Sequence, residues 1–140
     1  MSEELRQKIS YAVQVHRYSY GIVPTTLEAK ILQDADRLDA LGAIGIARLF
    51  MTGGSLRREL YSPLDPFCRT RKPDDGTWSL DHFYRKLLKL ELGMHTMVGK
   101  KLAKKRTAFL KNYLMELEAE VAGDLNIEIS ESPKCDVRKI

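Results

Sequence analysis

The sequence has few cysteines and no long apolar run, and each shortage excludes a class of protein. Among 140 residues there are two cysteines, Cys68 and Cys135, which lie far apart and lack the spacing of metal ligands. We expect both to be free thiols in a reducing compartment. No apolar run approaches the roughly 20 residues of a membrane-spanning helix, and the first residues lack the apolar segment of a signal peptide. These absences predict a cytoplasmic protein without a membrane partner.

The sequence also lacks the motifs of common catalytic and nucleotide-binding sites. It contains no phosphate-cradling glycine motif, no nucleophile elbow and no zinc finger. Its three histidines are His16, His82 and His95, and none of them is followed by aspartate. We expect His82 at a packed or exposed position and His95 in a linker.

What is present is typical of one globular domain, because 44% of the residues are hydrophobic and 30% are charged. The net charge is +4, and the densest basic segment is KKLAKKR at 100–106. This run could attract phosphates or nucleic acid. We favour the alternative that it is the solvated face of a helix with Leu102 turned inward, because basic runs are weak motifs.

Apolar residues recur three and four positions apart over most of the chain, which predicts an all-α fold. The expected helices cover 3–16, 25–51, 80–92 and 94–121, within one helical domain at 1–122. Thr25 and Glu28 form a capping box that opens the second of these helices. Glycines and prolines predict a long loop at 52–78. Residues 123–140 are expected to form a flexible tail with a short strand at 125–129.

The expected helix at 25–51 places one carboxylate, Asp36, in unusual surroundings. One face of this helix is an apolar stripe that includes Leu27, Ile31, Ala35 and Leu38. The helical neighbours of Asp36 are apolar too, namely Leu32, Ala40, Ala43 and Ala47. A helix that is apolar on most sides is expected to be buried. We therefore predict that Asp36 lies inside the protein, where it pairs with a basic group, takes up a proton or binds a metal ion.

Three blocks of this sequence resemble the HD-domain metal-dependent phosphohydrolases. They are TLEAKILQDADRLDALGAIGIAR at 26–48, MTGGSL at 51–56 and HFYRKLLKL at 82–90, in the family's order, and the resemblance spans roughly 3–121. In that superfamily an early histidine, a His-Asp pair and a late aspartate form the metal site. The late aspartate corresponds to Asp36. The resemblance implies a helical array like the C-terminal part of the HD fold, a divalent metal ion, and a phosphate-ester or nucleotide substrate.

The sequence departs from the family pattern because it has no His-Asp pair. One carboxylate cannot form a catalytic metal site, since such sites need several protein ligands. We therefore expect a truncated or degenerate HD phosphohydrolase that is inactive as an isolated chain. A complementing chain with the missing His and His-Asp ligands could complete it. Alternatively, it is a non-catalytic helical binding or assembly module for phosphate-rich ligands, with nucleic acid the less expected partner. Absent helices would leave apolar faces exposed, which favours a homo-oligomer in either case.

The resemblance suggests further residues around this site. His16 lies in the block HRYSYG, which resembles an HSxSxG-like block of the family. It could bind phosphate or donate a proton, or it could simply end a helix, where the negative end favours histidine. Asp39 could orient the site, whereas Arg37 could act near the phosphate or pair with Asp34. Lys30 and Arg48 could meet a phosphate.

Overall fold

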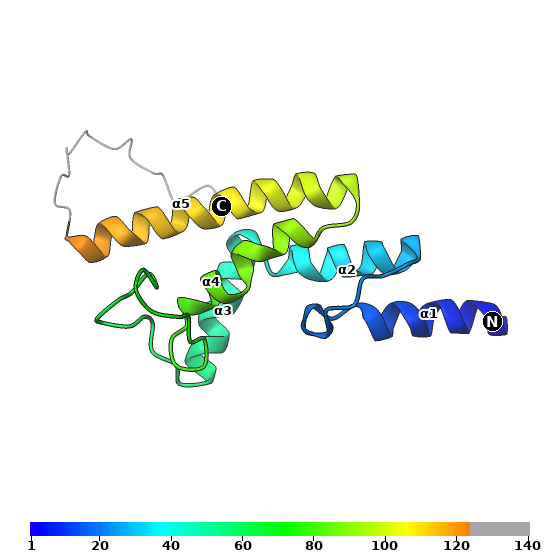
Figure 1. Ribbon diagram of the computed structural model, residues 1–140, viewed down its shortest axis with the longest axis horizontal. Coiled ribbons are helices and arrows are strands. Elements are labelled where there is room, and N and C mark those ends of the chain that lie inside the picture. Colours follow the sequence, from blue (N-terminus) through cyan, green and yellow to red (C-terminus); the bar gives the residue numbers. More distant parts are fainter. Residues whose placement is uncertain (124–140) are drawn as a thin grey trace, which may run out of the picture.

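The computed structural model describes residues 1–123 and shows an all-α fold, as predicted (Figure 1). Within this range the chain forms five α-helices and two short 3-10 helices. Their bounds are α1 Glu3–Val15, η1 Tyr18–Tyr20, α2 Leu27–Asp39, α3 Gly42–Ser55, α4 Asp81–Arg85, η2 Leu87–Gly93 and α5 Met97–Ala122. None of these helices combines the length and the hydropathy that crossing a bilayer requires. The predicted tail and its strand lie outside the described residues.

Side chains cap the N-termini of three helices. Ser2, Thr26 and Thr96 each accept a hydrogen bond from the backbone N–H three residues further on. The predicted cap of the second helix is therefore wrong by one residue, since Thr26 caps α2 and Thr25 does not. The hydroxyl of Thr25 instead lies 2.9 Å from the hydroxyl of Tyr11 on α1.

The single helix predicted at 25–51 is two helices, and the glycines explain the break. Gly42, the first residue of α3, has a φ of 78°, which L side chains rarely adopt. At Gly45 a Cβ atom would lie 2.2 Å from the carbonyl oxygen of Ala40, so the two helices approach too closely for any side chain there. Because α3 continues to Ser55, the long loop begins at residue 56 and not at 52.

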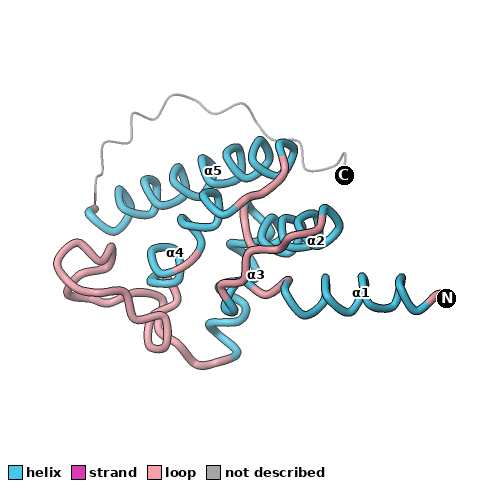
Figure 2. Tube along the Cα trace, turned by 45° about the vertical axis from the view of Figure 1, so that its right-hand side comes forward, coloured by secondary structure: helices cyan, strands magenta, loops and turns pink. Residues whose placement is uncertain are grey.

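The main core lies where α3, α4, η2 and α5 meet. Phe83 is fully buried there and stacks on Tyr113 with ring centroids 5.9 Å apart, while Phe50 packs beside both rings. Helix α1 lies apart from this core and packs on α2 through Ala12 and Val15 (Figures 1 and 2). Much of the surface of α1 and α2 is consequently not covered by the rest of the described chain.

The later helices differ in detail from the prediction. The expected helix at 80–92 is the short α4 followed by the 3-10 helix η2. In α5 the prediction that Leu102 turns inward is wrong, because Leu102 is exposed, like Val98 and Phe109, whereas Ala103 and Thr107 are buried. The lysines of the basic run at 100–106 are exposed, as expected for a solvated helix face.

Candidate functional site

Helix α2 buries a polar face and exposes its apolar stripe, which reverses the prediction. Gln33, Asp34 and Arg37 are all buried. Leu27 and Ile31, which belong to the predicted stripe, remain 63% and 52% exposed. The inward face of α2 therefore depends on hydrogen bonds, and its outward face is available to a further partner.

The buried acid of α2 is Asp34, and it caps α5 from outside that helix. Its carboxylate accepts hydrogen bonds from the backbone N–H groups of His95 and Thr96, both at 2.8 Å, and from the Thr96 hydroxyl at 2.7 Å. Burial alone would raise the pKa of the Asp34 carboxyl, but these hydrogen bonds outweigh it and hold the pKa below its usual value. Gly99 is required nearby, because a Cβ atom there would lie 2.3 Å from an Asp34 oxygen.

Gln33 ties α2 to two other segments and fixes the tautomer of His95. The Gln33 amide nitrogen donates to the carbonyl of Val15 at 2.8 Å and to that of Ile22 at 3.0 Å. Its amide oxygen, 2.6 Å from His95 Nε2, must then accept from that ring nitrogen. Neutral His95 therefore carries its proton on Nε2. His95 was predicted to be a linker residue, but it is part of the contact between α2 and the start of α5.

Arg37 lies on the same buried face and has a structural role. It donates to the carbonyl of Gly93, and its guanidinium lies 5.7 Å from the centre of the Tyr18 ring. One of its terminal nitrogens lies 3.2 Å from His95 Nε2, which has no free lone pair to accept from it. Burial and the neighbouring guanidinium of Arg37 therefore lower the pKa of His95 below its ordinary value.

This arrangement predicts a loss of stability in mildly acidic solution. The pKa of His95 is lower in the folded state than the roughly 6.5 of an unfolded chain. As the pH falls below about 6.5, the unfolded state takes up the proton first, so the free energy of unfolding falls with it. Urea unfolding at several pH values between about 7.5 and 5 measures this slope. The slope should flatten in the His95→Gln variant, and an unchanged slope would contradict the assignment.

The prediction that Asp36 is buried is wrong, because Asp36 is exposed on α2. The break between α2 and α3 removes Ala43 and Ala47 from its helix, and Leu32, one turn before it, is itself 39% exposed. Within residues 1–123 the Asp36 carboxylate makes no hydrogen bond or ion pair. Asp36 is thus a free acid on the surface of the described chain.

The other predicted site residues are only partly brought together. Lys30 is half-buried, Arg37 faces the interior, and Asp39 is exposed and pairs with Arg48. His16 is the C-cap of α1, half-buried, and its Nδ1 donates to a carbonyl of its own helix. The carbonyl of the preceding residue, Val15, accepts a hydrogen bond from the side chain of Gln33, which lies one turn before Asp36 on α2. The end of α1 with His16 and the Asp36 side of α2 are therefore close to each other.

The described residues do not form a metal site by themselves. Between residues 1 and 123, no three histidine, cysteine, aspartate or glutamate side chains come together in a way that could hold an ion. Asp36 has no second ligand beside it, so the residues present do not fit a catalytic divalent metal without additional ligands.

Two apolar grooves run along α2. The α1/α2 groove has a volume of about 300 Å³ and includes Leu5, Ile9, Val13 and Leu32. The α2/α5 groove has a volume of about 460 Å³ and includes Leu27, Ile31, Leu38 and Val98. Asp36 follows Leu32 by one helical turn and so lies at the edge of the α1/α2 groove. A segment that filled this groove would reach Asp36.

A third hollow, the basic cavity, has a volume of about 180 Å³. Basic side chains from three parts of the chain line it, namely Arg48 of α3, Arg58 of the loop, and His82 and Lys86 at α4 and its C-cap. Ala40, at the end of α2, and the hydroxyls of Thr52 and Ser79 line it too. Of these cations, the sequence suggested only Arg48 as a phosphate contact. His82 and Lys86 could have been suspected from their spacing, which places the two on one side of a helical turn, whereas no local pattern indicates Arg58.

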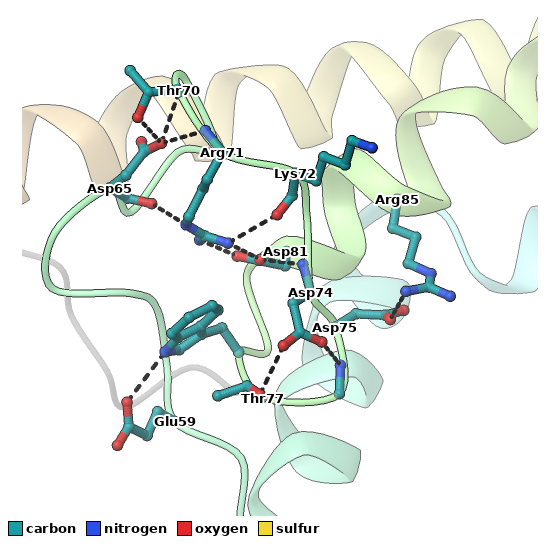
Figure 3. A network of polar contacts seen from close by, with 12 residues as sticks. Glu59, Asp65, Thr70, Arg71, Lys72, Asp74, Asp75, Thr77, Asp81 and Arg85 are labelled. Atoms are coloured by element: carbon teal, nitrogen blue, oxygen red, sulfur yellow. Dashed lines mark hydrogen bonds and ion pairs between the residues drawn. The ribbon is translucent and has the colours of Figure 1, made fainter.

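The loop at 56–80 holds part of this cavity in place through a buried ion pair (Figure 3). Arg71 donates two hydrogen bonds to the fully buried carboxylate of Asp81, at 2.5 and 2.8 Å, and its guanidinium lies 4.3 Å from the centre of the Trp78 ring. The backbone of Glu59 bonds to that of Thr77 and Ser79, which joins the two ends of the loop. Arg58 and Ser79 thereby meet at the cavity.

This chain spans between 43% and 64% of the length of the known proteins described below. The chain is 38% identical over 100 residues to YpgQ of Bacillus subtilis, matching 71% of this chain but only 43% of YpgQ. No family model matches the sequence. A crystal structure of a Lactobacillus plantarum protein superposes with a TM-score of 0.73 at 30% identity, covering 89% of this chain and 64% of that protein.

Two further solved structures relate the fold to function. The structure of B. subtilis YpgQ in complex with ADP superposes with a TM-score of 0.69 at 33% identity, over 88% of this chain and 56% of YpgQ. An HD-superfamily hydrolase of Bacillus thuringiensis superposes with a TM-score of 0.57 at 35% identity, over 84% of this chain and 62% of that protein. The resemblance carried by the sequence blocks is thereby confirmed, and the described chain has an HD-superfamily fold.

Proposed function

We propose that this chain is one part of a metal-dependent phosphohydrolase of the HD type and contributes Asp36 to its metal site. The observation that carries the proposal is an exposed acid without a partner at the edge of an uncovered apolar groove. An exposed aspartate does not require an apolar groove beside it. Such a groove, when exposed to water, favours association with another surface. Together they suit a site that is completed when a further segment packs on α2.

The lengths of the relatives support this proposal. YpgQ is matched over less than half of its length, so it contains segments without counterpart in the residues that align. We infer that a segment of this kind, in the same polypeptide or another, fills the α1/α2 groove and supplies the histidine and His-Asp ligands. The phosphate-ester or nucleotide substrate is part of the proposal, and the YpgQ structure with ADP is compatible with it.

Metal binding tests the proposal. We expect the chain alone to bind Mn²⁺ weakly, because a single carboxylate is a poor site. Joining it through a flexible linker to the part of YpgQ that lies outside the match should create a tight site, measured by isothermal titration calorimetry. Asp36→Asn should weaken that site at least about tenfold, and Glu116→Gln, an exposed acid of α5, should leave it unchanged. Equal affinity in the Asp36→Asn protein would contradict the assignment.

The exposed apolar grooves also favour a second candidate function, a non-catalytic assembly module whose simplest form is a homo-oligomer. In that case the grooves would be filled by a second copy of the chain. Analytical ultracentrifugation of Ile9→Glu and Ile31→Glu variants separates the two, because an oligomer that depends on either groove should dissociate. A protein that is monomeric with both grooves intact would leave only the first proposal.

A further inference from the structure

The basic cavity contains more positive charge than its neighbours neutralise. Arg48 pairs with Asp39, and His82 lies 2.7 Å from a carboxylate oxygen of Asp75. Arg58 and Lys86 also line the cavity, and both are half-buried. Neither makes an ion pair or a side-chain hydrogen bond with another residue between 1 and 123, and the Lys86 ammonium lies 5.5 Å from the centre of the Tyr18 ring. Two positively charged side chains that line this hollow are therefore without an acidic partner in the described chain.

The hydroxyl of Ser79 lines the same cavity. The Ser79 residue as a whole is only 4% exposed. Its hydroxyl oxygen is not among the fully enclosed, unpaired polar atoms of residues 1–123, which are Arg37 Nε and Thr107 Oγ1, and as a cavity-lining group it can donate to a ligand there. Gly53 makes room for the Ser79 hydroxyl, because a Cβ atom at position 53 would lie 2.1 Å from the Ser79 oxygen. The absence of a side chain at position 53 keeps the hydroxyl at the cavity.

The size of the cavity limits what it can hold. Pockets for drug-sized ligands have volumes of about 300–1,000 Å³, and this one is about 180 Å³. A whole nucleotide would not fit within it, but a single tetrahedral anion would. Two unpaired cations match the two negative charges that a phosphate group carries near neutral pH.

We propose that the basic cavity binds a phosphate dianion, free or as the phosphate of a monoester, between Arg58 and Lys86 with Ser79 as a hydrogen-bond donor. Arginine and lysine donate strong hydrogen bonds to phosphate oxygens, and a hydroxyl can supply one more. The catalytic meaning of the site rests on the proposed function. Ala40 lines the cavity one turn after Asp36, so the bound phosphate would lie near the proposed metal ligand.

Calorimetric titration of the chain with inorganic phosphate, with EDTA present and ionic strength held constant, tests the proposal. One phosphate should bind per chain. Arg58→Gln and Lys86→Gln should each weaken binding by about 10- to 100-fold, because each removes a hydrogen bond to a charged group. Lys104→Gln, which removes an equal charge from the exposed face of α5, should bind as the unaltered chain does. An equal loss in all three variants, or no saturable binding to the unaltered chain, would overturn the proposal.

A second measurement needs no variant and so does not depend on their folding. Phosphate added to the isotope-labelled chain should shift the backbone amide signals of Thr52 and Ser79, whereas shifts confined to 100–106 would overturn the site. These binding experiments test the phosphate site separately from the proposed function, because they contain no metal ion. Phosphate binding without hydrolysis in the completed protein would contradict only the proposed function. Hydrolysis with an unchanged KM in the Arg58→Gln protein would contradict only the phosphate site.

Discussion

Replacing Arg71 with alanine is expected to lower the free energy of unfolding by about 3–5 kcal/mol. The substitution would leave the carboxylate of Asp81, which has no exposed surface, without its main partner. The backbone N–H of Asp74 also donates to Asp81, but one amide cannot compensate a buried charge. The guanidinium of Arg71 would no longer cover the Trp78 ring, so the loop that carries Arg58 and Ser79 should loosen.

Denaturant unfolding measures this effect, and the same loop offers a matched control. Arg69 pairs with Glu118, but the two side chains are 70% and 39% exposed. An exposed pair of this kind contributes about 0–1 kcal/mol, so Arg69→Ala should change the stability little. Similar losses in the two variants would show that the buried pair is not what holds the loop.

The second large effect is expected at Asp34, whose replacement by alanine should lower the free energy of unfolding by about 2–4 kcal/mol. Three donors at the start of α5 would lose their acceptor, namely the backbone N–H groups of His95 and Thr96 and the Thr96 hydroxyl. α5 is the longest helix of the described chain, and Asp34 is what ties its first turn to α2.

The control lies two residues further along the same helix. Asp36→Ala makes the same chemical change at an exposed acid, and surface substitutions of that kind usually change stability by less than about 0.5 kcal/mol. Circular dichroism during urea titration distinguishes the two variants directly. A large loss in Asp36→Ala, or none in Asp34→Ala, would reverse the roles that the structure gives to the two acids.

The choice between these two acids shows where sequence reasoning fails. Helical periodicity places Asp34 and Asp36 on different sides of α2, but it cannot say which side is covered. What covers Asp34 is the start of α5, more than 60 residues later in the chain. The apolar neighbours of Asp36 suggested burial, yet two of them belong to α3, which begins only after a break that the periodicity does not reveal.

Local signals were more informative than long-range ones. The capping box at Thr25 and Glu28 located the start of α2 to within one residue. The all-α class followed from the spacing of apolar residues. The basic cavity was not predictable in this way, because Arg58 and Lys86 come from segments that only the loop at 56–80 brings together.

The short sequence Asp34-Ala35-Asp36 contains two acids in different surroundings. The first acid is buried and joins helices, whereas the second is exposed and available to a ligand. Loss of Asp36 should therefore leave the described structure intact, and under the proposed function it should affect the chemistry.

Turnover of a phosphate ester with and without the additional segment tests the central claim most directly. The chain should hydrolyse p-nitrophenyl phosphate or ADP at the background rate, with or without Mn²⁺. The same chain joined to the part of YpgQ outside the match should show Mn²⁺-dependent hydrolysis, and Asp36→Asn should lower kcat/KM at least about 100-fold. Rapid Mn²⁺-dependent hydrolysis by the 140 residues alone, or full activity without Asp36, would contradict the account.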